Sequence, residues 1–232
     1  MTNRGFYKRS FDLTVLTLAY GLLLPLWVAL WVLIPALIWL GDRGPVFYRQ
    51  RRVGKHGQVF TVAKFRTMVV DADRKGPPWT VHGDTRVTTI GRLLRRTALD
   101  ELPELASIWK GNMSLVGPRA LGIAEHESLR EQIPGFEKRL QVLPGLTGLA
   151  QIYDRTDNAR DKFRYDLDYL RRMSLWLDIK ILILSVRNTL AARWDQRAGK
   201  PLRASGASDS WETTRQRSTT LDEEHITTDS PR

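Results

Sequence analysis

The sequence predicts an α+β, membrane-associated fold with an N-terminal re-entrant membrane helix, a small β-hairpin and a mostly helical domain. Three observations predict it: a long uncharged segment, two β-rich runs around a glycine-containing turn, and helical apolar spacing through most of the remainder. We expect the membrane helix and its basic flank in residues 1–43, the folded domain in 44–198 and a disordered polar tail in 199–232.

The composition of the chain excludes several kinds of functional site and indicates the charge of its partner. The 232 residues carry a formal net charge of +11, so the partner of the folded domain is expected to be an anionic membrane or an anionic substrate. The chain has no cysteine, which excludes disulfides, thiolate catalysis and cysteine-based metal sites. Its four histidines are scattered, so any metal is expected to be a hard cation held by carboxylates and phosphate.

Residues 13–40 form a run of 28 uncharged residues, longer than the roughly 20 that cross a bilayer. Lys8 and Arg9 precede this run, and a second basic cluster follows it in 43–55. Because basic flanks stay on the cytoplasmic face, this symmetry favours a segment that enters and leaves on one face over a spanning helix. Pro25 lies near the middle and predicts a kink. A spanning helix and a buried apolar helix are the alternatives.

The first elements after this run are a hairpin, a loop and two helices. Residues 46–68 contain two β-rich runs around Gly54-Lys55-His56-Gly57, which is typical of a hairpin. Residues 71–85 are polar and rich in turn residues, which predicts a loop, and 86–97 place arginines at helical spacing. A second helix ending near Gly111 is predicted by the i, i+3, i+4, i+7 spacing of Leu102, Leu105, Ala106 and Trp109.

The C-terminal half is predicted to be helical with glycine- and proline-rich connections. In chain order we expect a loop at 115–118, a helix at 121–132, a turn-rich loop at 144–148, and helices at about 160–172 and 176–194. The last helix is rich in tryptophan and isoleucine, which suits a buried position and a membrane-surface position equally well.

The acidic pair Asp100 and Glu101 is the strongest candidate for chemistry. Pro103 is tolerated only in the first turn of a helix, so both acids are expected at a helix N-terminus, whose field should lower the pKa of a carboxylate there and keep it ionised. Adjacent helical side chains point about 100° apart, so one carboxylate could attack while the other binds metal or moves a proton. Acids that only complement the helix dipole are the alternative. The cations nearby favour a phosphate site; they are Lys64, Arg66, Arg86, Arg92, Arg95, Arg96 and Arg119.

A series of motifs in a fixed order links the chain to a known family. They are Lys8–Asp12, Gly44–Tyr48, Gln50–Gly54, Lys64–Met68, Thr85–Thr88, Gly91-Arg92, Leu99–Leu105, Lys110–Arg119, Pro144–Gln151, and Tyr165-Asp166 through Ser174–Asp178. Over about residues 4–190 the chain resembles the bacterial sugar transferases, which are monotopic phosphoglycosyl transferases. Three positions depart from the family pattern: Asn112, Ala120 and Leu143, of which Leu143 bears on donor binding.

The resemblance implies a re-entrant helix broken at Pro25 and a cytoplasmic catalytic domain on the bacterial inner membrane. It implies transfer of a sugar-1-phosphate from a UDP-sugar to undecaprenyl phosphate, with release of UMP, as the first step of exopolysaccharide, capsule or lipopolysaccharide synthesis. Asp100 would attack the donor and carry the phosphosugar. Glu101 would assist as metal ligand or base, and Mg²⁺ would be held by both acids.

The resemblance also assigns further positions. Substrate binding falls on Lys64, Arg66, Arg86, Pro118, Arg119 and Asp166, and membrane association on Lys8, Arg9 and Pro25. The alternatives are an inactive membrane scaffold and a basic binding protein of the same pathway. Nucleic acid is not expected as a partner, because the basic residues come without a stacking platform or a helix-turn-helix pattern. The sugar, the glycan and the presence of a homodimer are left open.

Overall fold

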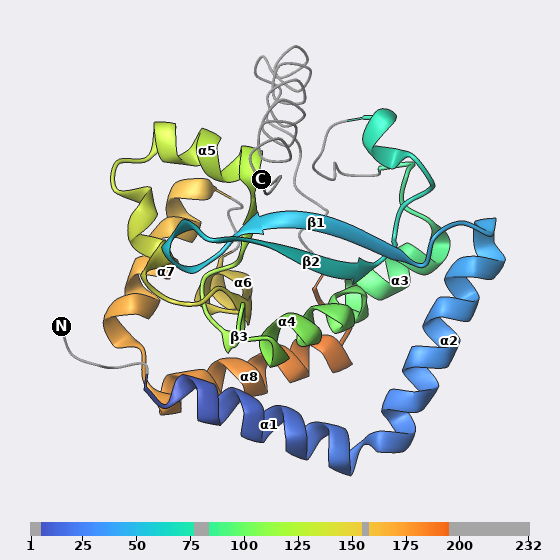
Figure 1. The fold of residues 1–232 in the computed structure, drawn as a ribbon, viewed down its shortest axis with the longest axis horizontal. Coiled ribbons are helices and arrows are strands. Elements are labelled where there is room, and N and C mark those ends of the chain that lie inside the picture. The colour runs from blue at the N-terminus through green and yellow to red at the C-terminus, as the bar shows by residue number, and fades with distance from the viewer. Residues whose placement is uncertain (1–5, 77–83, 155–157, 195–232) are drawn as a thin grey trace, which may run out of the picture.

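The computed structural model describes residues 6–76, 84–154 and 158–194. Helices surround two small sheets in this part of the chain: a three-stranded sheet of order β2-β1-β4, and the pair β3-β5. Figure 1 shows the long hairpin of β1 and β2 lying above α4, with α1 along the lower edge of the molecule. The expected mixture of helix and sheet, with helix dominant, is confirmed. The predicted tail, 199–232, lies outside the described residues.

The apolar N-terminal run forms two helices. Helix α1 spans Lys8–Leu22 and α2 spans Leu24–Asp42, with Leu23 in a non-helical conformation between them. Pro25 occupies the first turn of α2, where its missing N–H leaves no hydrogen bond unmade. The kink predicted near Pro25 is therefore a complete break between two helices, and α2 rises from the end of α1 to meet β1 (Figure 1).

Helix α2 is mostly uncovered by protein. Within the described residues it is the one helix that is long and apolar enough to cross a membrane, with a mean hydropathy of 2.1, and only 11% of it is buried. Its covered side is narrow: Ile34 and Ile38 pack against Phe65 and Leu94. This contact fixes α2 to the end of the hairpin and to α3.

Helix α1 is tied to the domain by its first residues. The ammonium group of Lys8 donates to the carbonyl oxygen of Val116 at 2.6 Å, to Tyr169 Oη at 3.0 Å and to Asp178 Oδ2 at 2.9 Å. Arg9 donates to the last carbonyl oxygens of α4, at 2.5 and 2.7 Å. Both basic side chains thus contact the domain, Lys8 at a partly buried position and Arg9 at an exposed one, and their membrane role stays a prediction.

The predicted hairpin is confirmed. Strand β1 (Phe47–Val53) pairs antiparallel with β2 (Val59–Phe65), with Phe47 opposite Phe65 and Val53 opposite Val59. The short 3₁₀ turn η1 (Lys55–Gly57) joins them, and Gly57 has a φ of 79°, which glycine adopts without strain. Strand β4 (Leu121–Gly122) adds to the other edge of β1.

The segment after the hairpin differs from prediction in its boundaries. A 3₁₀ turn, η2 (Ala72–Arg74), lies in the predicted loop. Helix α3 spans Thr89–Thr97 and begins later than predicted, because Thr88 caps it by accepting a hydrogen bond from Gly91 N at 2.9 Å. The single helix predicted up to Gly111 consists of a 3₁₀ helix, η3 (Leu99–Glu104), followed by α4 (Leu105–Trp109).

In the C-terminal half, the predicted loops contain a parallel strand pair. Strand β3 (Ser114–Val116) pairs with β5 (Gly145–Thr147), so the prediction of loops there was wrong. Three residues are too few for an alternating pattern to be recognised. The other elements are α5 (Ile123–Gln132), the 3₁₀ helix η4 (Phe136–Gln141), α6 (Leu149–Tyr153), α7 (Ala159–Arg172) and α8 (Leu175–Leu190). Helices α5, α7 and α8 agree with prediction; η4 and α6 were not predicted.

Candidate active site

Asp100 and Glu101 lie in the first turn of η3, which packs against β2. Ala98, with a φ of 54°, separates η3 from α3 and turns the chain back toward the sheet. On the other side of η3, Leu99 and Leu102 pack against the cluster that anchors α2. The predicted position at a helix N-terminus is confirmed, although the helix is 3₁₀. The acidic pair lies close to the part of α2 that contains Ile34 and Ile38.

Glu101 is held by two cations. Its Oε1 atom accepts hydrogen bonds from Lys64 Nζ and from Arg119 Nη2, both at 2.7 Å. Burial acts to raise the pKa of Glu101, but Arg119 and Lys64 outweigh burial and hold this pKa well below its usual range. Glu101 is therefore an ionised carboxylate fixed in place.

Asp100 differs from Glu101 in both its contacts and its pKa. It is 9% exposed, and the described residues give its carboxylate no hydrogen bond or ion pair. Burial and the charge of Glu101 raise its pKa to about 6, against the opposing effect of Lys64, Arg95 and Arg119. The expectation of a lowered pKa was wrong for Asp100, because loss of solvation outweighs the field of one 3₁₀ turn. The result is a basic carboxylate with unoccupied lone pairs, as a nucleophile requires.

Three further charged residues belong to this site. Arg95, in the last turn of α3, donates to Thr67 Oγ1 at 2.8 Å and lowers the pKa of Asp100. Glu104, which is 2% exposed, lies 3.4 Å from Lys64 Nζ and 3.8 Å from Arg52 Nη1. Neither Glu104 nor Arg52 was predicted. The signal was the spacing: in a 3₁₀ helix residues i and i+3 share one face, so Glu104 follows Glu101.

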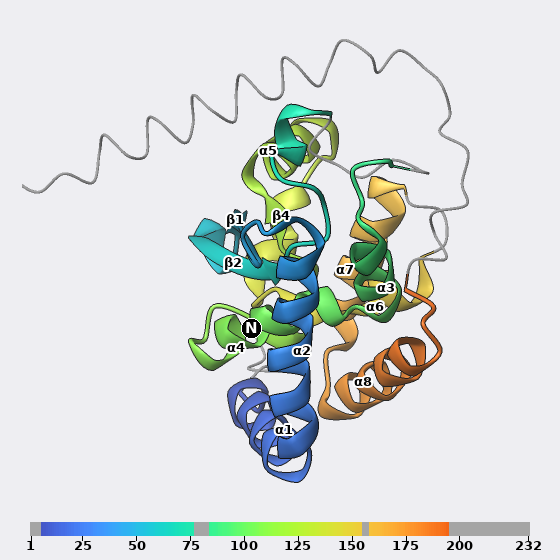
Figure 2. The same ribbon diagram turned by 90° about the vertical axis from the view of Figure 1, so that its right-hand side faces the viewer.

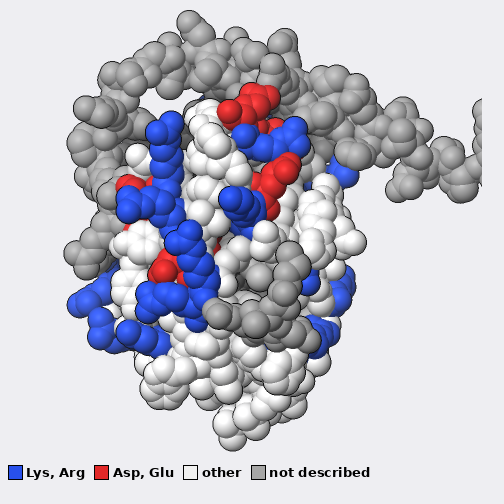
Figure 3. All heavy atoms as spheres, turned by 90° about the vertical axis from the view of Figure 1, so that its left-hand side faces the viewer, with Lys and Arg blue, Asp and Glu red and all other residues white. Residues whose placement is uncertain are grey.

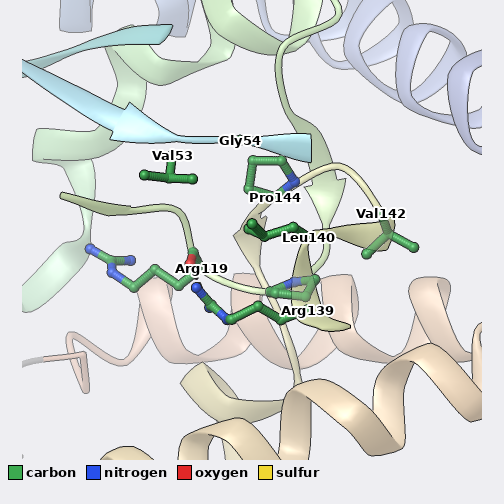
Figure 4. Close-up of a pocket in the computed structure, with 8 residues that line it drawn as sticks. Val53, Gly54, Arg119, Arg139, Leu140, Val142 and Pro144 are labelled. Carbon is green, nitrogen blue, oxygen red and sulfur yellow. Dashed lines mark hydrogen bonds between the residues drawn. The ribbon is translucent and has the colours of Figure 1, made fainter. Parts of the chain in front are cut away.

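The strand pair β3-β5 positions Arg119. Gly145 N donates to the carbonyl oxygen of Pro118 at 2.9 Å, and a Cβ on Gly145 would lie 2.0 Å from Gly117 N, so only glycine permits this approach. A cavity of about 10 Å³ lies here, lined by Val53, Gly54, Pro118, Arg119, Arg139, Leu140, Val142 and Pro144 (Figure 4). It has room for one water molecule.

The predicted substrate-binding residues are only partly brought together. Lys64 and Arg119 contact Glu101, and Pro118 adjoins Arg119. Asp166 accepts a hydrogen bond from Arg139 Nε at 2.8 Å. The partners of the other two lie elsewhere: Arg66 pairs with Asp42 at the end of α2, and Arg86 pairs with Asp84 and the carbonyl oxygen of Ala72.

The donor set fits a cation that is shared with a substrate. Across residues 6–76, 84–154 and 158–194, no group of three or more His, Cys, Asp or Glu side chains could hold a metal alone. Asp100 and Glu101 supply hard oxygen ligands, and Mg²⁺ commonly takes one or two carboxylates and completes its shell with water and substrate phosphates. A divalent cation bound together with a diphosphate matches these residues.

Asp100 is thus a buried carboxylate of raised pKa beside Lys and Arg side chains, an arrangement found in group-transfer enzymes that act on phosphorylated substrates. The family model described as bacterial sugar transferase matches residues 3–192. The chain belongs to this family.

Relatives of the chain carry related names. It is 39% identical, over 77% of its length, to the UDP-glucose:undecaprenyl-phosphate glucose-1-phosphate transferase of Escherichia coli K12, of which it covers 39%. It is 36% identical, over 80%, to an Aeromonas hydrophila UDP-N-acetylgalactosamine-undecaprenyl-phosphate N-acetylgalactosaminephosphotransferase, of which it covers 44%. With a Caulobacter vibrioides transferase named for UDP-glucose the identity is 38%, over 79% of this chain and 69% of the relative. The chain thus spans about two fifths of the length of the first two.

Proposed function

We propose that this protein transfers a sugar-1-phosphate from a UDP-sugar to undecaprenyl phosphate through a covalent intermediate on Asp100, with release of UMP. The observation that carries the proposal is the contrast within the acidic pair: Asp100 has no hydrogen-bond partner among the described residues, whereas Glu101 is held by Lys64 and Arg119. The names of the relatives agree with this donor and acceptor and differ in the sugar.

In the first step a carboxylate oxygen of Asp100 attacks the phosphorus that bears the sugar. A bond from this oxygen to phosphorus forms, the bond from phosphorus to the bridging oxygen breaks, and its electron pair leaves with UMP. The raised pKa of Asp100 makes its carboxylate a stronger nucleophile than an ordinary aspartate while it stays ionised near neutral pH. The product is an aspartyl phosphosugar.

In the second step an oxygen of undecaprenyl phosphate attacks the same phosphorus and displaces the carboxylate of Asp100. The products are undecaprenyl diphosphate sugar and free enzyme. A phosphate oxygen that is already deprotonated needs no base. Glu101 is in any case a poor base, because its pKa is held far below neutral pH. Of the two roles expected for Glu101, we therefore favour metal ligand over base.

The cations would bind the donor. Lys64 and Arg119 both contact Oε1 of Glu101, which supports a role for them in binding the diphosphate beside Asp100. Asp100 and Glu101 would hold Mg²⁺ together with that diphosphate. When bound, Mg²⁺ neutralises charge that develops on the phosphate oxygens.

The proposed location is the cytoplasmic face of the bacterial inner membrane, with α1 and α2 re-entrant. The break at Leu23, the exposed apolar surface of α2 and the basic residues on both flanks support this arrangement. Figure 2 shows α1 and α8 together at the lower end of the molecule, and in Figure 3 this end is largely free of charge while Lys and Arg gather above it. An apolar end with Lys and Arg above it on this face suits an anionic membrane surface.

The test is release of UMP from a panel of UDP-sugars by detergent-solubilised protein with undecaprenyl phosphate and Mg²⁺. We expect release with one or a few sugars, and loss of at least about 1,000-fold in Asp100→Asn, because the amide cannot act as nucleophile. Asp168→Asn, on the exposed side of α7, is the matched control and should keep full activity. A folded wild-type protein that is silent across the panel would favour the inactive scaffold.

A further inference from the structure

Arg139 is a buried arginine that joins two segments of the site. It lies in η4, is 5% exposed and has its guanidinium carbon 5.1 Å from the centre of the Phe136 ring. Its Nε atom donates to Asp166 Oδ2 at 2.8 Å, and its Nη2 atom donates to the backbone carbonyl oxygen of Arg119 at 2.7 Å. One planar group therefore connects α7 to the loop after β3.

The contact with Arg119 is made to its main chain. Figure 4 shows the guanidinium of Arg139 pointing at the backbone oxygen of Arg119, while the side chain of Arg119 extends in a different direction. That side chain reaches Glu101 Oε1 at 2.7 Å. Fixing the carbonyl group restricts the rotation of the peptide after Arg119 and so limits where its side chain can point.

Asp166 is poorly placed to bind substrate itself. It is almost fully buried, and its charge is paired with Arg139 at 2.8 Å. A chain of contacts therefore connects α7 to the acidic pair: Asp166 binds Arg139, Arg139 binds the main chain of Arg119, and the side chain of Arg119 binds Glu101. Each of these hydrogen bonds is 2.8 Å or shorter.

We propose that Arg139 is a positioning residue, which, held by Asp166, fixes the main chain of Arg119 and thereby keeps the Arg119 side chain at Glu101. Asp166 then acts through Arg139 and makes no contact with substrate. This inference rests on the proposed function, since its effect is on donor turnover. A positioning role differs from a packing role because the effect of Arg139 on turnover then depends on the presence of the Arg119 side chain.

The test is a double-mutant cycle on UMP release with Arg139→Met, Arg119→Met and the double variant. We expect Arg139→Met to lower kcat/KM by about 10- to 100-fold, and to lower it less than about threefold once Arg119 is already methionine. Lys138→Met, at the neighbouring exposed position, is the matched control and should leave kcat/KM unchanged. Arg139→Lys keeps the charge but loses the planar guanidinium that presents Nε to Asp166 and Nη2 to the carbonyl oxygen of Arg119 in a fixed geometry, so it should not restore activity.

Equal losses in both backgrounds would overturn the proposal, because Arg139 would then act on substrate directly or on the fold as a whole. If Arg139→Met does not fold, Asp166→Asn and Asp166→Ala replace it in the cycle; the asparagine keeps an acceptor for Arg139 and should retain more activity than the alanine. Wild-type protein that releases no UMP contradicts the proposed function instead. In that case the Kd for UDP in the presence of Mg²⁺ is measured by calorimetry for the same variants. An equal loss of affinity on Arg139→Met in the wild-type and Arg119→Met backgrounds would again overturn the positioning role.

Discussion

Asp100 and Glu101 are chain neighbours with opposite electrostatic environments. Burial and a neighbouring negative charge raise the pKa of Asp100, whereas two directly bound cations lower that of Glu101. Pairs of carboxylates separated in this way take different roles in catalysis. The difference arises from contacts made by Lys64 on β2 and Arg119 after β3, and neither contact can be read from the two acidic residues alone.

The pH dependence of UMP release should follow Asp100. The ionised carboxylate is the nucleophile, so kcat/KM should fall as the pH drops through about 6. Lys64 lowers the pKa of Asp100, so its removal in Lys64→Met should raise that pKa and move the acid limb to higher pH, besides reducing donor binding. A pH profile of kcat/KM checks this, with Lys138→Met as control. An acid limb at the same pH in Lys64→Met would contradict it.

Glu104 should contribute to stability. Burial lowers the pKa of Arg52, the charge of Arg119 lowers it further, and Glu104 opposes both effects. Glu104→Gln would remove a negative charge that balances the buried guanidinium of Arg52. We expect a loss of about 1–3 kcal/mol in the free energy of unfolding. Denaturant unfolding in detergent measures this loss. Glu137→Gln, which alters an exposed ion pair, should change the free energy by less than about 0.5 kcal/mol; equal effects of the two variants would contradict the prediction.

At the scale of elements, α3 is held close to the end of the hairpin. A Cβ on Gly91 would lie 2.0 Å from the carbonyl oxygen of Thr67, which is backbone and cannot move aside. Gly91→Ala should therefore displace α3 and with it Arg95, at a cost of about 1–3 kcal/mol in the free energy of unfolding, together with reduced UMP release. Gly21→Ala, in α1, has no heavy atom within 4 Å of the new Cβ and serves as control. Equal stability of the two variants would count against this contact.

The elements predicted from the sequence are those whose pattern is local. The hairpin has its glycine turn, and α5, α7 and α8 are at least ten residues long, so their ends or their apolar period are visible in the chain. The pair β3-β5 depends on segments far apart in the sequence and on the close approach at Gly145, which no local pattern records. The site divides in the same way: the acidic pair and its cations were predicted, whereas the roles of Glu104, Arg52 and Arg139 depend on tertiary contacts.

At the scale of the whole molecule, the N-terminal helices are joined to the domain at both ends. Lys8 is paired with Asp178 at the start of α1, and Asp42 with Arg66 at the end of α2. If α1 and α2 became one straight helix, its first residues would move away from Asp178. The tether at Lys8 therefore favours the bent arrangement independently of Pro25.

Pro25→Ala alone should accordingly keep the N-terminus on the cytoplasmic face, and Pro25→Ala with Lys8→Met should allow part of the population to span the membrane. Because the chain has no cysteine, Thr2→Cys provides a single site for a maleimide that cannot cross the membrane, applied to spheroplasts. We expect labelling only in the background with both substitutions. Labelling with Pro25→Ala alone would show that the proline, and not the tether, controls the topology.

The pairing of Lys8 with Asp178 also has a consequence for the order of events during synthesis. The two residues are 170 positions apart, so α1 leaves the ribosome long before its partner in α8 exists. Contacts between such distant positions form late. In the proposed membrane arrangement, α1 and α2 are therefore available to the bilayer before the domain is complete, and the hydrogen bonds of Lys8 can form only once α8 has been synthesised and folded.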